Sequence, residues 1–172
     1  MPKILREKEI LKRKMFSIKE LEIKTKKGNV VFDVVEKKDS VMIVPITDDG
    51  KLVLIKEYFA ATDDYQIGLP KGRIEDGDVK KATNRELQEE IGYKSKKLTK
   101  LATVSVSPGN IRHKTHIFLA QELVESKLEG DEIGKIKVIK VPFANFGRMI
   151  GKEITEARMI AALYLAKRFL EK

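Results

Sequence analysis

The stretch LPKGRIEDGDVKKATNRELQEEIGY, residues 69–93, decides the fold of this chain. A glycine-rich, acidic turn leads into a predicted helix over residues 78–92, with Gly92 as its C-cap. Three glutamates of this helix stand at i, i+3 and i+4 and fall within a sector of roughly 100°: Glu86, Glu89 and Glu90. Apolar residues fill the neighbouring sector, so the carboxylates are expected at the edge of the buried stripe.

Carboxylates at this spacing repel one another by a few tenths of a kcal/mol per pair, and an i,i+4 pair between Arg85 and Glu89 offsets only part of that. Mg²⁺ binds carboxylate oxygens, keeps several waters and adds phosphate oxygens of a substrate. The cluster is therefore interpreted as a metal site for a phosphate-bearing ligand. An ordinary exposed acidic helix face is the alternative, and the glycine-rich turn before the helix favours the metal site.

Apolar runs predict strands on both sides of this helix. They flank the turns KKGN and DDG and recur after the helix, at residues 15–25, 29–37, 41–47, 51–59, 98–106, 115–123 and 135–142. Several runs carry apolar residues at successive positions, which is typical of strands covered on both faces. The expected fold class is α/β (α+β), with a mixed central sheet between helices and an N-terminal antiparallel strand pair.

Two more helices are expected near the C-terminus. A short one is predicted over residues 144–150 and a long one over residues 153–172. The long helix carries an apolar stripe at helical spacing, which we expect to face the core: Met159, Ala162, Leu163, Ala166 and Leu170.

Composition indicates one globular domain of 172 residues with a heavily charged surface. The chain has no cysteine, no apolar segment near the roughly 20 residues that cross a bilayer, and no signal-peptide pattern, so a cytoplasmic protein is expected. The net charge is +9, and residues 1–27 hold ten Lys or Arg against four Glu. This charge has two interpretations, a nucleic-acid partner or a solvated lysine-rich surface, and we favour the solvated surface.

The glycine, arginine and glutamate pattern resembles the signature of the Nudix hydrolases. That signature is a glycine, five residues, a glutamate, seven residues, and then Arg-Glu-apolar-any-Glu-Glu-any-Gly-apolar. Gly72 matches the first glycine, and residues 85–93 match the second half in full. Asp78 stands in place of the first glutamate, and the spacer VKKATN has six residues instead of seven. Asp78 is therefore not assigned as a ligand.

Stretches outside the signature resemble the ADP-ribose pyrophosphatase branch of that family, among them VMIVPITDDGKLVLIKEYF and SVSPGNIRHKTHIFLAQEL. The resemblance implies a Nudix-type α/β/α sandwich over residues 38–172. It also implies an N-terminal strand extension, residues 1–37, that pairs two chains into a homodimer.

The resemblance further implies an enzyme that uses Mg²⁺ or Mn²⁺. It would hydrolyse the pyrophosphate bond of ADP-linked nucleotides, the class of ADP-ribose, diadenosine triphosphate and NADH, and release AMP. Alternatives are a Nudix-type pyrophosphohydrolase of RNA 5′ ends and a non-catalytic ADP-ribose sensor. The expected partner is a small ADP-containing dinucleotide or nucleotide sugar, with no membrane and no nucleic acid.

Residue roles follow from the same resemblance. The metal ligands are expected to be Glu86, Glu89, Glu90 and the Gly72 backbone. The catalytic residues are expected to be Arg85, Glu86, Glu89 and Glu132, the last as a general base on the loop LEGDE, where it is preferred over Glu129. One of the three helix glutamates is the alternative general base. Substrate binding is expected at Lys56, Glu57 and Pro108.

Overall fold

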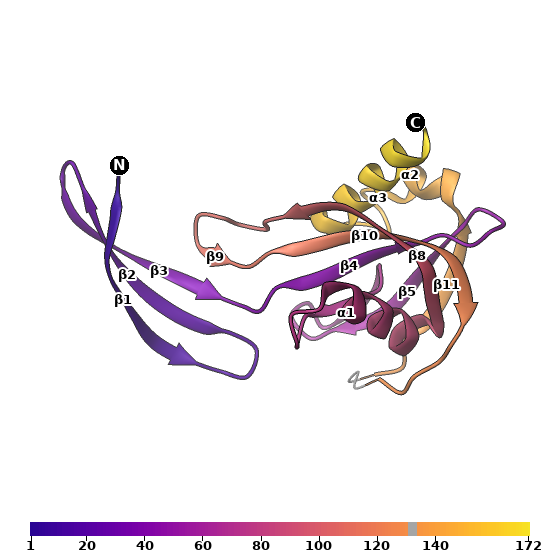
Figure 1. The fold of residues 1–172 in the computed structure, drawn as a ribbon, viewed down its shortest axis with the longest axis horizontal. Helices are drawn as coiled ribbons and strands as arrows, with labels where there is room; N and C mark the ends of the chain where they lie inside the picture. Colours follow the sequence, from indigo (N-terminus) through magenta and orange to yellow (C-terminus); the bar gives the residue numbers. More distant parts are fainter. Residues whose placement is uncertain (131–133) are drawn as a thin grey trace. The chain divides into compact units, whose positions relative to one another are not determined.

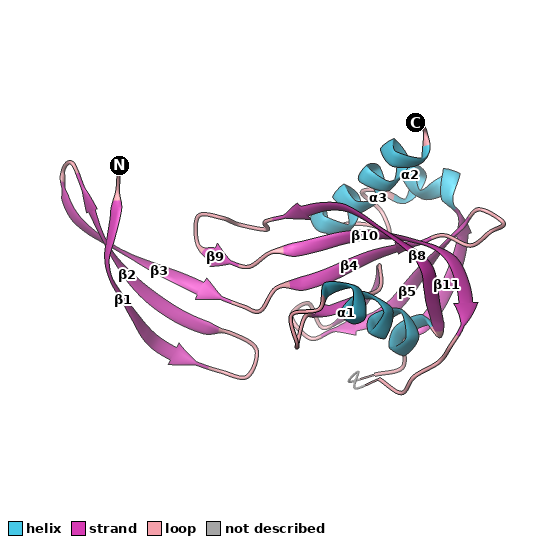
Figure 2. Cartoon of the chain, in the orientation of Figure 1, coloured by secondary structure: helices cyan, strands magenta, loops and turns pink. Residues whose placement is uncertain are grey.

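The computed structural model describes residues 1–130 and 134–172. Contacts within the chain separate two units. Unit 1 comprises residues 1–39 and 105–115, and unit 2 comprises residues 40–104 and 116–172. Strands make up most of the regular structure of each unit (Figure 2).

Unit 1 is an antiparallel meander of three strands, β1 (Lys3–Lys12), β2 (Ser17–Thr25) and β3 (Gly28–Glu36). The sequence predicted only the last two as a strand pair. Strand β1 was missed because six of its ten residues are charged and its few apolar residues do not alternate regularly with polar ones. Its backbone pairs with β2 from Lys3↔Lys24 to Lys12↔Ser17.

The segment 105–115 is attached to the end of β3. Its short strand β9 (Ile111–Arg112) pairs in parallel with β3. Backbone bonds run from Val35 N to Asn110 O (2.9 Å) and from Lys37 N to Arg112 O (3.1 Å). The Arg112 guanidinium donates to Glu7 (3.0 Å) and to Glu36 (2.8 Å), so ion pairs join this segment to β1 as well as to β3.

Unit 2 contains two sheets. Their strand orders are β7-β4-β10-β8 and β11-β5-β6. The strands are β4 (Ser40–Pro45), β5 (Lys51–Phe59), β6 (Asp64–Gly68), β7 (Lys71–Arg73), β8 (Tyr93–Val104), β10 (Thr115–Glu125) and β11 (Lys137–Pro142).

Helices lie on both sides of these sheets, with α1 on one side and α2 and α3 on the other (Figure 1). They are α1 (Val79–Glu86), the π-helix η1 (Leu87–Ile91), the 3₁₀-helix η2 (Phe143–Asn145), α2 (Phe146–Met149) and α3 (Ala157–Leu170). Among the described residues, no helix combines the length and the hydropathy needed to span a membrane.

The core consists of two clusters, one on each side of the sheets. On β4, Val41 and Ile43 pack with residues of α1 and η1, whereas Met42 and Val44 pack with residues of α3. This alternation explains why β4 is apolar at successive positions, and it confirms the predicted sandwich. The stripe on α3 is buried at its first four predicted positions. Leu170 is 41% exposed, and its expected core position was wrong because it is the last residue of the helix.

Candidate active site

A capping residue stands at each end of the acidic helix. Asp78 is the N-cap of α1, and its Oδ1 accepts a hydrogen bond from Lys81 N at 3.0 Å. Gly92 closes the helix with φ of 76°, a left-handed conformation that favours glycine. The predicted helix and its C-cap are therefore confirmed. The Asp78 side chain serves as the helix cap.

The helix changes type where the glutamates stand. α1 ends at Glu86, and residues Leu87–Ile91 form a π-turn, in which Gly92 N donates to Leu87 O, five residues back. The wider turn buries Leu87 and Ile91 in the core and leaves Glu89 at its edge. Such π-turns are rare and are frequently found at functional sites. The sequence predicted a regular α-helix here.

Two of the glutamates are buried against strand β7. Glu86 is 7% exposed and Glu90 is 6% exposed. Glu90 Oε2 accepts a hydrogen bond from the backbone of Lys71 at 3.0 Å, which fixes the carboxylate beside β7.

Gly72 faces the carboxylate of Glu86 directly. A Cβ at this position would lie 2.0 Å from Glu86 Oε1, far inside ordinary van der Waals contact. Only glycine leaves the room that the Glu86 carboxylate occupies. The first glycine of the sequence motif therefore has a steric reason, and it brings the backbone of β7 against the acidic helix.

Arg85 bridges the carboxylates of the cluster. Its guanidinium donates to Glu89 Oε2 at 2.7 Å and to the carbonyl of Arg73 at 3.0 Å, and it pairs with Glu86. Three acceptors thus hold one guanidinium fork, whose planar geometry suits this kind of bridging. Arg85 is placed to orient Glu86 and Glu89 relative to the end of β7.

A second cation was not predicted from the sequence. The Lys71 ammonium pairs with Glu57 on β5 and lies over the ring of Phe59, 4.9 Å from its centroid. Both charged side chains are largely shielded, with Lys71 at 19% and Glu57 at 18% exposure. The one available signal was the position of Lys71, directly before Gly72 in LPKG.

The electrostatics of the site converge on Glu90. Burial raises the pKa of the Glu90 carboxyl well above its usual value, and the charges of Glu57 and Glu86 act in the same direction. The Lys71 ammonium and its backbone N–H oppose this rise. A buried carboxylate with acidic neighbours is a position where added positive charge is strongly favoured.

The donor set fits a hard divalent cation. Glu86, Glu89 and Glu90 offer carboxylate oxygens, and the β7 backbone runs against them at Gly72. Such oxygen ligands suit Mg²⁺ or Mn²⁺. In the described part of the chain no three acidic or histidine side chains are grouped closely enough to hold an ion, and Arg85 lies between Glu86 and Glu89.

The other predicted residues are placed as follows. Lys56 is exposed on β5, next to Glu57. Pro108 belongs to unit 1, where it lines a hollow of about 390 Å³ together with apolar residues of β2 and β3. Glu132 lies outside the described residues, so its role as general base stays a prediction.

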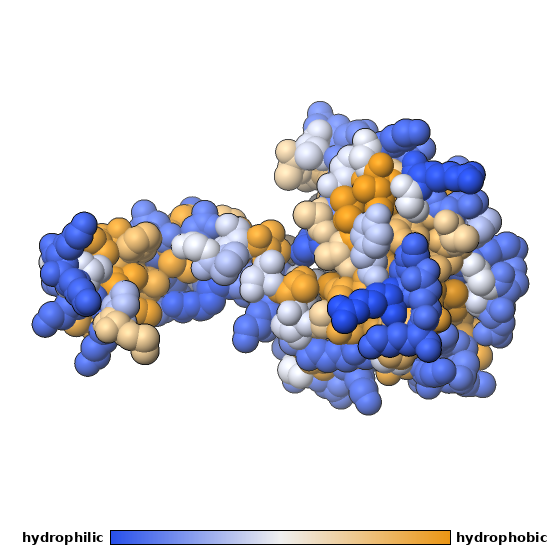
Figure 3. All heavy atoms as spheres, turned by 90° about the horizontal axis from the view of Figure 1, so that it is seen from above, coloured by the Kyte–Doolittle hydropathy of each residue, from blue (hydrophilic) through white to orange (hydrophobic). Residues whose placement is uncertain are grey.

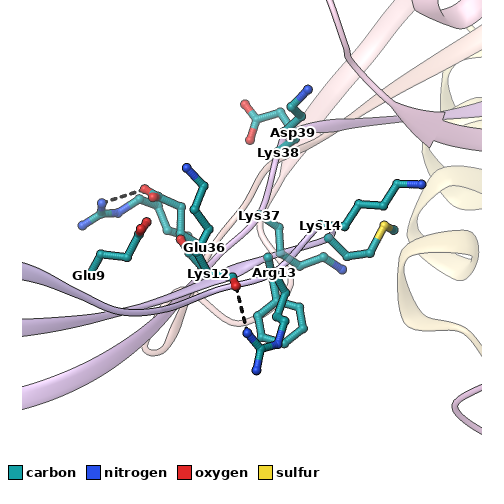
Figure 4. Close-up of a pocket in the computed structure, with 12 residues that line it drawn as sticks. Glu9, Lys12, Arg13, Lys14, Glu36, Lys37, Lys38 and Asp39 are labelled. Atoms are coloured by element: carbon teal, nitrogen blue, oxygen red, sulfur yellow. Dashed lines mark hydrogen bonds and ion pairs between the residues drawn. The ribbon is translucent and has the colours of Figure 1, made fainter.

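Unit 1 also has a basic hollow of about 520 Å³. Figure 4 shows basic side chains around it from the end of β1, from the β1–β2 turn and from the segment after β3: Lys12, Arg13, Lys14, Lys37 and Lys38. None of the predicted site residues lines it. It accounts for part of the positive charge that the sequence gathers in its first residues.

Comparison with known proteins identifies the family. The sequence-family model of the NUDIX domain matches residues 36–163 of this chain. This chain belongs to the Nudix family. It is 34% identical to the ADP compounds hydrolase NudE of Escherichia coli (strain K12), over 99% of this chain and 94% of that protein. It is 31% identical to an ADP-ribose pyrophosphatase of Bacillus subtilis (strain 168), over 94% and 92%.

A solved structure supports the same assignment. The crystal structure of an ADP compounds hydrolase superposes on the Nudix chain with a TM-score of 0.87. The two are 32% identical, and the alignment covers 99% of this chain and 94% of that one. The predicted family and fold are thereby confirmed.

Proposed function

We propose that this Nudix protein hydrolyses the pyrophosphate bond of ADP-linked nucleotides and releases AMP. The observation that carries the proposal is the placement of Glu86 and Glu90 against strand β7, with Gly72 leaving room for a carboxylate. Relatives named for ADP compounds and for ADP-ribose support the ADP-linked substrate class.

Mg²⁺ or Mn²⁺ would be held by Glu86, Glu89, Glu90 and the backbone at Gly72. When bound, such an ion neutralises phosphate charge and lowers the pKa of water. Arg85 orients two of the carboxylates through its bridging hydrogen bonds. The burial of Glu90 keeps bulk water away from one side of the cluster.

The reaction consumes one water for each bond broken. The water oxygen forms a bond to one phosphorus of the diphosphate, and the bridging P–O bond breaks. One proton of the water passes to a general base, for which we propose Glu132. For ADP-ribose the products are AMP and a phosphorylated ribose. Lys56, Glu57 and Pro108 are proposed to contact the substrate.

We also propose a homodimer formed through unit 1. The support is the number of large apolar side chains that its sheet exposes, visible as orange patches among charged residues in Figure 3. They are Ile4, Leu5, Ile10, Val30, Val31 and Phe32, between 40% and 62% exposed. Exposed apolar groups of this kind are typical of protein interfaces. Light scattering after size exclusion tests the proposal, and a monomer at micromolar concentration would contradict it.

A turnover screen tests the enzymatic function. ADP-ribose, diadenosine triphosphate, NADH, an ADP-sugar and a triphosphorylated RNA oligonucleotide are incubated with Mg²⁺ or Mn²⁺. AMP is quantified for the ADP-linked compounds, and released phosphate and pyrophosphate are quantified for the RNA. We expect AMP from the ADP-linked compounds and none from Glu89→Gln. Faster turnover of the RNA end would select the RNA alternative. Tight binding of ADP-ribose with no product would select the sensor.

A further inference from the structure

We propose that Lys71 is a further substrate-binding residue that contacts the diphosphate, and that Glu57, besides its own proposed contact with the substrate, positions the Lys71 ammonium. The inference rests on the proposed function. We call the side chains of Glu57, Glu86, Glu89 and Glu90 together the acidic cluster. The main chain of Lys71 is fixed beside this cluster in two ways. Strand β7 pairs Lys71 with Met42 of β4, and the Lys71 N–H donates to Glu90 Oε2 at 3.0 Å.

The side chain of Lys71 is held as well. Its ammonium pairs with Glu57, and its position over the Phe59 ring adds a cation–π contact at 4.9 Å. The pair is mostly shielded from water, so it is worth more than an exposed surface pair. A long, flexible side chain is thereby kept in one place beside the site.

The Lys71 ammonium can still donate hydrogen bonds to a ligand, whereas the Arg85 guanidinium already donates to three acceptors of the protein. An ammonium has three N–H donors, and Glu57 is its one carboxylate partner in the described part of the chain. Arg85 divides its guanidinium among Glu86, Glu89 and the Arg73 carbonyl. Lys71 is therefore the better placed cation to donate to a phosphate oxygen.

The formal charge of the site also favours Lys71 as the group that contacts the diphosphate. The four carboxylates and the two cations that pair with them through their side chains have a formal charge of −2 when all are ionised: Glu57, Glu86, Glu89, Glu90, Lys71 and Arg85. The ammonium of Lys127 is bonded to the main-chain carbonyl of Glu89 and is not counted. One divalent cation only balances that charge. An incoming diphosphate then needs a directed positive group, and the Lys71 ammonium supplies one while it remains paired with Glu57.

The test compares Lys71→Gln with the double variant Lys71→Gln/Glu57→Gln. The double variant removes both charges together and leaves no shielded carboxylate without a partner, so it keeps the test valid if the single variant unfolds. Lys51→Gln is the matched control, because Lys51 also forms an ion pair, with Asp49 at 2.6 Å, but takes no part in the acidic cluster. Binding of α,β-methylene ADP is measured by calorimetry with Mn²⁺ present, alongside KM and kcat for ADP-ribose.

A charge-assisted hydrogen bond corresponds to about 10-fold to 100-fold in affinity. We expect both Lys71 variants to raise the Kd of the methylene analogue and the KM of ADP-ribose by about that factor, with Mn²⁺ affinity retained and Lys51→Gln unchanged. Glu57→Gln alone raises KM by less, because the ammonium remains but is no longer aimed. Analogue affinity within about 2-fold of wild type in both Lys71 variants would overturn the inference. If the wild type itself turns over no ADP-linked compound, the proposed function fails instead.

Discussion

Replacing Gly72 by alanine should displace the Glu86 carboxylate, a proposed metal ligand, without changing any charge. The new Cβ would lie 2.0 Å from Glu86 Oε1, and ordinary contact begins at 3.4 Å, so the carboxylate must retreat by about 1.4 Å. Glu86 cannot simply swing into solvent, because it is buried and paired with Arg85. A displacement of about 1 Å at a reacting centre can cost about 100-fold in rate.

We therefore expect Gly72→Ala to lower kcat/KM for ADP-ribose by about 100-fold, or about 2.7 kcal/mol of transition-state stabilisation. Overpacking should lower the free energy of unfolding by about 1–3 kcal/mol. AMP release measured over a Mn²⁺ series gives the first quantity, and urea unfolding gives the second. Gly147→Ala is the control, because its Cβ meets nothing within 4 Å and its φ is not in the left-handed region. Wild-type kcat/KM in folded Gly72→Ala would refute the steric argument.

Three further predictions concern the acidic helix. Because burial raises the pKa of Glu90 above its unfolded value, the folded metal-free protein binds the extra proton, and its free energy of unfolding falls as pH rises above about 4.5. Glu90→Gln removes this pH dependence and should raise the metal-free Tm at pH 7 in calorimetry; a lower Tm contradicts it. Asp78→Ala loses the helix cap and should lower the free energy of unfolding in urea by about 1 kcal/mol. Asp78→Asn keeps a capping oxygen and should lower it by almost nothing. Equal losses in the two variants would show that the charge of Asp78 matters more than the cap. Arg85→Lys keeps the charge but loses the planar fork that bridges three acceptors. We therefore expect kcat to fall about 10-fold or more with little change in KM. A selective rise in KM would instead indicate that Arg85 contacts the substrate.

The sequence was most informative where local chemistry determines structure. The acidic helix, its end at Gly92 and the strands on either side of DDG follow from apolar periodicity and turn residues, and the structure confirms them. The two-sided burial of β4 also follows from its unbroken apolar run.

Tertiary contacts explain what the sequence could not predict. Lys71 and Glu57 are 14 residues apart and meet only because their strands are brought together in the fold. The π-turn at Leu87–Ile91 has no residue-type signature that separates it from an α-helix. Strand β1 has no regular apolar alternation, and its place is fixed by backbone pairing with β2.

The attachment of β9 to β3 has a practical consequence for protein engineering. Unit 1 is made from two separate pieces of chain, so the polypeptide passes between the units three times, near residues 39, 104 and 115. Deleting the first 39 residues would leave the carbonyls of Asn110 and Arg112 without their present donors and Arg112 without its carboxylates. A chimaera that borrows the N-terminal sheet of a relative should therefore exchange residues 105–115 at the same time.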